Sequence, residues 1–157
     1  MTMCSRTRPL RAWDGLRAVL RTHAAYALLD RTGAHGGTWV TGACGLLAMA
    51  LHEIIPNSEI LDLRDATGRP QHVLIRIDGR VFLDGDGLSL WPTLQRRWIT
   101  VELRRPPLTV SPHALAACQR GNIPLDPADV RLVLDYLRQH LIRTPEGIPQ
   151  FVVASPR

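Results

Sequence analysis

Three residues whose side chains cooperate in nucleophilic catalysis follow one another in the first half of the chain. Cys44 comes first, within Gly42-Ala43-Cys44-Gly45, and an apolar run follows it. His72 opens one run of aliphatic residues, and Asp84 closes the next. A cysteine attacks a carbonyl carbon as the thiolate, a histidine can remove the thiol proton, and a carboxylate can orient the imidazole. These residue types therefore suit acyl-transfer chemistry at amide or thioester bonds.

The position of Cys44 favours an ionised thiol. The apolar run from residue 46 to 51 predicts a buried helix that begins near Cys44 and ends by Ile55, ahead of a proline. A helix amino terminus stabilises negative charge, so the pKa of a thiol placed there falls below its usual value of about 8.5. Gly42 and Gly45 leave space around the sulfur for a substrate carbonyl.

The pattern around Asp78-Gly79 predicts how His72 meets an acid. Asp-Gly between two alternating apolar runs is a strong hairpin signal. A plain two-residue turn would mix polar and apolar residues on each face, whereas a bulge at Gly79 leaves one face apolar. In that register Asp86 lies opposite His72 and Asp84 lies on the adjoining diagonal, so both are candidates to orient the imidazole. The bulged register pairs Ile77 with Val81 and Ile75 with Leu83.

The other elements complete an α+β fold. Helical periodicity predicts one amphipathic helix at about Pro9 to Leu29, and a capping residue before proline predicts helix starts at Ser111-Pro112 and Asp126-Pro127. We expect a single domain over residues 1–157, with residues 36–90 as the core of the site and residues 111–143 as a helical carboxy-terminal part. Strands are expected at Glu59 to Leu63, His72 to Ile77, Arg80 to Leu83, Trp98 to Leu103 and Gln150 to Val153.

Length and composition exclude several classes of protein. The 157 residues, 45% hydrophobic and 21% charged, match an ordinary folded domain rather than a disordered or fibrous chain. The longest apolar stretch, residues 43–51, is shorter than the roughly 20 residues that cross a bilayer, so we expect no membrane association. The chain shows no Sec signal, which predicts a cytoplasmic location and leaves a Sec-independent route of export open.

The charge pattern argues against a nucleic-acid partner. All 19 basic residues are arginine, and a net charge of +5 in an Ala-, Gly- and Pro-rich chain is also what a GC-rich genome encodes. The segment that holds the expected hairpin, residues 59–88, carries four arginines and six acids. That segment lacks the positive charge that phosphate binding requires.

The sequence shows no metal site, cofactor motif or disulfide framework. Three widely spaced cysteines without a C-x-x-C pair indicate reduced thiols, and Cys4 and Cys118 are interpreted as core residues. His52-Glu53 begins an H-E-x-x-H pattern, but a proline stands where the second histidine belongs. A metal bound by Cys44, His72 and Asp84 would have three ligands and no second anchoring motif.

Residues 42–51, 71–76 and 81–87 together resemble the papain-like cysteine peptidase fold, as found in small bacterial and phage proteins. The resemblance covers about residues 36–90. It implies that Cys44 is the nucleophile, His72 the base and Asp84 the orienting acid, with Asp86 as the alternate. It also implies an oxyanion hole that includes the backbone N–H of Cys44. The family pattern has glutamine six residues before the cysteine, and Thr38 occupies that place here.

The expected fold is therefore papain-like, with the amino-terminal helix and the Cys44 helix packed on a small antiparallel sheet and with helices in the carboxy-terminal third. The expected function is a cysteine hydrolase or acyl-transfer enzyme that acts on peptide, isopeptide or glutamine side-chain amide bonds of a protein or peptide substrate. One alternative is a non-catalytic inhibitor or adaptor on the same fold, which would have an unreactive thiol. A second is an arginine-rich nucleic-acid binder, whose affinity would fall steeply with salt. The oligomeric state is not indicated.

Overall fold

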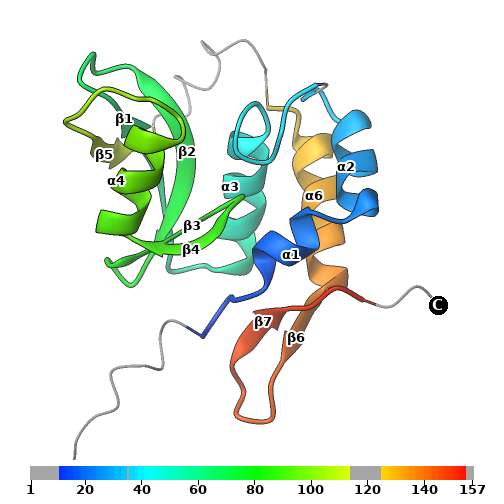
Figure 1. Ribbon diagram of the computed structural model, residues 1–157. Coiled ribbons are helices and arrows are strands. Elements are labelled where there is room, and N and C mark those ends of the chain that lie inside the picture. Colours follow the sequence, from blue (N-terminus) through cyan, green and yellow to red (C-terminus); the bar gives the residue numbers. More distant parts are fainter. Residues whose placement is uncertain (1–10, 35, 114–124, 155–157) are drawn as a thin grey trace, which may run out of the picture.

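The computed structural model, shown in Figure 1, describes residues 11–34, 36–113 and 125–154. The protein has an α+β fold with a five-stranded antiparallel sheet in the order β4-β3-β2-β1-β5 and a separate two-stranded sheet of β6 and β7. Helix α4 covers one face of the large sheet, and α3 covers the other, with α6 behind it (Figure 1). Within the described residues, no helix is both long and apolar enough to cross a membrane.

The large sheet carries the hairpin expected from the sequence. Ile77 pairs with Val81 and Ile75 with Leu83, so the bulged register is confirmed. Asp78 and Gly79 both have left-handed backbones, with φ of 51° and 69°, as in a type I′ turn, and the Arg80 N–H donates to the Ile77 carbonyl at 3.2 Å, so the extra residue of the register is Arg80 rather than Gly79. The strands are β1 (Glu59–Arg64), β2 (Pro70–Ile77), β3 (Val81–Asp84), β4 (Gly87–Leu90) and β5 (Thr109–Pro112), of which β4 and β5 were not expected.

The larger core lies between the sheet and the helices. Helix α3 (Cys44–Ile54) begins and ends where the sequence predicts, and six of its residues are buried. It packs between β2 and α6 (Pro127–Gln139), whose first turn is capped by the Asp126 carboxylate accepting the Ala128 N–H at 2.8 Å. Burial of α3 against the sheet fixes its amino terminus, and therefore Cys44, beside the ends of the strands.

The smaller core lies under α4 (Trp91–Thr100). The sequence prediction of a strand over residues 98–103 was wrong. Leu94 and Trp98 are four residues apart and both fully buried, which is helical spacing, and a proline in the first turn favours a helix start. Val101 and Leu103, whose apolar side chains suggested the strand, are 68% and 79% exposed after the helix ends.

The prediction for the amino-terminal part of the chain also needs correction. The expected helix from Pro9 to Leu29 is two helices, α1 (Leu16–Leu20) and α2 (His23–Asp30), because the Thr22 hydroxyl accepts the Ala25 N–H and starts a new helix. Residues 1–10 lie outside the described part.

The segment from 111 to 143 is not uniformly helical. Ser111 and Pro112 lie in β5, because this segment pairs with β1 as an edge strand, where proline is tolerated. Helix α6 follows, and then β6 (Leu141–Arg143) pairs with β7 (Pro149–Phe151), close to the expected last strand. Residues 114–124, which include Cys118, lie outside the described part, as does Cys4.

Candidate active site

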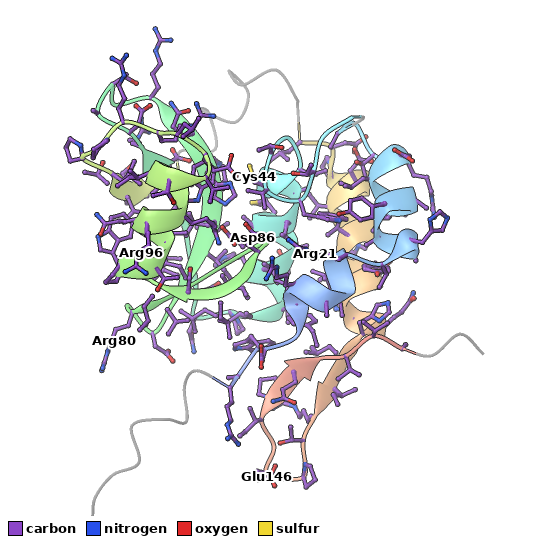
Figure 2. All side chains as sticks on the ribbon, in the orientation of Figure 1. Arg21, Cys44, Arg80, Asp86, Arg96 and Glu146 are labelled. Atoms are coloured by element: carbon purple, nitrogen blue, oxygen red, sulfur yellow. The ribbon has the colours of Figure 1, made fainter. Side chains whose placement is uncertain are left out.

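The structure brings Cys44, His72 and Asp84 together where the amino terminus of α3 meets β2 and β3. Cys44 is the first residue of α3, and Figure 2 shows it at the end of that helix. The pKa of its thiol is lowered by His72, so the two side chains lie close together. The Nε2 atom of His72 lies 2.9 Å from Oδ2 of Asp84, which leaves the other ring nitrogen, Nδ1, for the thiol. Nδ1 is buried and makes no hydrogen bond to the described residues, so it is the ring nitrogen that remains free to exchange a proton with the thiol.

The surroundings of the pair favour its charged form. Burial alone would raise the pKa of the Cys44 thiol, but the hydrogen bond and charge of His72, together with the N–H groups of Val73 and Gly45, bring it below its ordinary value of 9.0. Burial lowers the pKa of His72, but hydrogen bonds to Asp84 and Cys44 outweigh burial and raise it to about 9. Both shifts therefore favour a thiolate beside an imidazolium over the neutral thiol and imidazole.

Asp84 is held in its ionised form by three donors. The side chain is 2% exposed and accepts hydrogen bonds from His72 Nε2, from the Arg97 guanidinium and, at 2.9 Å, from the Asp86 N–H. Burial raises the pKa of Asp84, whereas His72, Arg97 and the Asp86 N–H lower it below its ordinary value of 3.8. A buried carboxylate with three donors orients the imidazole rigidly.

Helix α4 contributes two contacts that the sequence analysis missed. The Trp98 ring lies against the His72 ring, with centroids 4.6 Å apart and an interplanar angle of 33°. The preceding residue, Arg97, binds Asp84. Both were overlooked because residues from 98 onward were predicted as a strand. The four-residue spacing from Leu94 to Trp98, preceded by a proline, was the available signal for the helix.

Asp86, the alternate acid, has a different environment. Its carboxylate lies 3.5 Å from both Arg21 and Arg97 and 4.0 Å from Arg17. Figure 2 shows Asp86 and Arg21 close together beside α1. Asp86 therefore links α1 to α4, and Asp84 is the acid that contacts His72.

Thr38, the expected oxyanion donor, closes the turn that leads into α3. Its hydroxyl oxygen accepts the N–H groups of Val40 and Thr41, at 3.2 and 2.9 Å, and lies 2.9 Å from the Thr41 hydroxyl. Its carbonyl accepts the Ala43 N–H. Gly42 has φ of +95°, a left-handed backbone that explains the glycine before Cys44. The other flanking glycine, Gly45, is packed against Leu125 rather than left open.

A pocket of about 430 Å³ lies beside these segments. The turn that holds Thr38 forms one wall, and the residues that directly follow Asp84 form another. Its lining residues are Leu20, Arg21, Tyr26, Thr38, Trp39, Val40, Thr41, Gly85, Asp86, Val101 and Glu102. The pocket is thus bounded by both chain segments that lead to the site.

A second buried histidine–aspartate contact joins β1 to the residue that follows β5. His113 Nδ1 contacts Asp62 Oδ1, and Arg64 Nη2 lies 3.1 Å from Asp62 Oδ2. Arg64 also donates to the Ser111 hydroxyl at 2.8 Å. The network ties the edge strand β5 to the sheet.

No group of three or more His, Cys, Asp or Glu that could hold a metal occurs in the described residues.

Comparison of the chain with protein-family models, with curated proteins and with solved structures found no match.

Proposed function

We propose that the protein is a papain-like cysteine hydrolase or acyl-transfer enzyme in which Cys44 is the nucleophile, His72 the base and Asp84 the orienting acid. The observation that carries this proposal is the buried His72 ring between the Cys44 thiol and the Asp84 carboxylate. A cysteine that only filled space would need neither an imidazole at its sulfur nor an ionised acid behind that imidazole.

The geometry supports a defined sequence of steps. The Cys44 thiolate attacks the carbonyl carbon of an amide, and its charge passes to the carbonyl oxygen. The first backbone N–H groups of a helix lack intrahelical acceptors, so the N–H of Cys44 is available to stabilise that oxyanion. The proton on Nδ1 of His72 then passes to the leaving amine, and water or another amine releases the acyl group. Asp84 keeps the ring oriented and stabilises its cation.

The substrate class is a protein or peptide amide. Peptide bonds, isopeptide bonds and glutamine side-chain amides share the acyl group that this chemistry transfers. The neighbouring pocket is lined by the partly exposed apolar side chains of Tyr26 and Val101, which suit a polypeptide side chain.

One observation favours the non-catalytic alternative. The Thr38 hydroxyl oxygen accepts from the Val40 and Thr41 N–H groups and lies 2.9 Å from the Thr41 hydroxyl, so its described contacts are within its own turn and none of them is to Cys44. An inhibitor or adaptor on this fold would keep the packing of the site without turning over a substrate.

The test is capture of the acyl-enzyme. The protein is incubated with peptide p-nitroanilides, an isopeptide-linked peptide pair and a glutamine-containing peptide, quenched in acid and digested for mass spectrometry. We expect at least one acyl adduct on the Cys44 peptide, together with release of the matching amine or ammonia. Cys44→Ser removes the adduct, and His72→Gln greatly slows its formation. Absence of any adduct, or an adduct that forms equally in His72→Gln, contradicts the proposal.

A further inference from the structure

A fourth charged residue reaches the site from α4. The guanidinium of Arg97 contacts Oδ2 of Asp84, the same oxygen that receives Nε2 of His72. We propose that Arg97 acts on the site through Asp84: its charge balances that carboxylate and so lowers the pH range in which Cys44 and His72 both lose their protons. Its role in acyl transfer rests on the proposed function, whereas its effect on the two ionisations is measured separately.

Three features of Arg97 distinguish it from an ordinary surface arginine. Its side chain is 19% exposed, so its charge is only weakly screened by solvent. Its Nε atom lies 3.5 Å from Oδ2 of Asp86, so one guanidinium lies between two carboxylates. It also precedes Trp98, whose ring lies against His72. One turn of α4 therefore fixes both the imidazole ring and the acid that orients it.

These contacts form a chain of alternating charges across the molecule. The order is thiolate Cys44, imidazolium His72, carboxylate Asp84 and guanidinium Arg97, and then carboxylate Asp86. Beyond Asp86, the chain ends at Arg17 and Arg21 of α1, which are largely exposed. The same pocket that holds Asp86 and Arg21 also includes Glu102, just after α4. Each member therefore has a neighbour of opposite sign, from α3, β2, β3, α4 and α1.

Removal of Arg97 would leave this chain with an extra negative charge. A nearby negative charge disfavours the Cys44 thiolate and favours the His72 imidazolium, so both groups hold their protons more tightly. The titration midpoints of both residues therefore rise. Loss of positioning alone would act differently: with the contacts between Cys44 and His72 loosened, the Cys44 midpoint would rise while the His72 midpoint fell.

The test compares Arg97→Gln with Arg97→Lys, which keeps the charge. The Cys44 midpoint is read from the pH dependence of its iodoacetamide alkylation, resolved by mass spectrometry. The His72 midpoint is read by NMR of ¹³C-labelled histidine, assigned with His72→Gln. In Arg97→Gln we expect both midpoints to rise by about one pH unit, which means about tenfold slower alkylation of Cys44 at pH values below the midpoint. Arg97→Lys should restore most of both shifts.

A second variant keeps the inference testable if Arg97→Gln fails to fold. Asp86→Asn removes a negative charge on the far side of Arg97 and should lower both midpoints slightly. An unchanged or lower His72 midpoint in Arg97→Gln, a rise in Arg97→Lys as large as in Arg97→Gln, or unchanged midpoints in Asp86→Asn overturns the role of Arg97. That failure differs from failure of the proposed function, in which Cys44 of the unchanged protein is unreactive near pH 6.

Discussion

Replacement of Asp84 by asparagine tests how the acid controls the imidazole. The variant keeps the shape of the side chain and an oxygen that can accept from Nε2 of His72, and it removes the charge that faces Nε2 at 2.9 Å. A hydrogen bond to a charged group contributes about 1.5 to 3 kcal/mol, and one pKa unit corresponds to about 1.4 kcal/mol. The pKa of His72, which Asp84 and Cys44 raise to about 9, should therefore fall by about one to two units.

The assay is the pH titration of the His72 ring by NMR of ¹³C-labelled histidine in both proteins. Asp86→Asn is the matched control. It removes the charge of a nearby carboxylate that contacts Arg21 and Arg97 and makes no described contact with the His72 ring. Its effect on His72 should be much smaller. A His72 midpoint that stays near 9 in Asp84→Asn, or that moves equally in Asp86→Asn, would refute the assignment of Asp84 as the orienting acid.

Three further predictions concern stability and the turn before α3. The pKa of Asp84 in the folded protein lies below its ordinary value of 3.8, so ionised Asp84 stabilises the fold above pH 3.8 and loses this effect as the pH falls through the folded-state pKa. The difference in the free energy of unfolding between the unchanged protein and Asp84→Asn, measured by urea unfolding, should therefore shrink below pH 3.8. Gly85→Ala should lower the free energy of unfolding by about 1 to 3 kcal/mol, because the added Cβ would lie 2.7 Å from the Trp39 carbonyl. Gly45→Ala should be neutral or stabilising, because Gly45 is in a helix and its added Cβ would have its nearest neighbour at 3.5 Å. Equal melting temperatures of the two variants would contradict this prediction. Thr38→Ala should lose about 1 kcal/mol of stability and less than the 10²-fold in acyl transfer expected of an oxyanion donor, so a larger rate loss would restore Thr38 to that role.

The parts of the site that local patterns determine were predictable from the sequence. The apolar run after Cys44 determines a buried helix whose start carries the thiol. The alternation around Asp78-Gly79 requires a bulge, because only that register keeps one face apolar, and it places Asp84 within reach of His72. These features depend on neighbours within about a dozen residues of one another.

The parts that depend on distant packing were not predictable. Trp98 and Arg97 reach the site only because α4 lies across the sheet, and a short apolar segment fits a strand or a helix equally well by its spacing. The choice between Asp84 and Asp86 depended on β4, which was not expected: β3 ends at Asp84, and Asp86 lies in the turn to β4, where it contacts Arg17, Arg21 and Arg97. A single sequence carries no signal for such tertiary partners.

The measurement that tests the central claim most directly is the pH dependence of Cys44 alkylation by iodoacetamide, in the unchanged protein and in His72→Ala. Mass spectrometry resolves the rate at each cysteine, so Cys4 and Cys118 serve as internal references. A thiolate stabilised by His72 predicts that Cys44 reacts much faster than either reference at pH 6 and loses this advantage in His72→Ala. A Cys44 that stays unreactive until the pH passes about 8.5, with the same profile in His72→Ala, would contradict the claim.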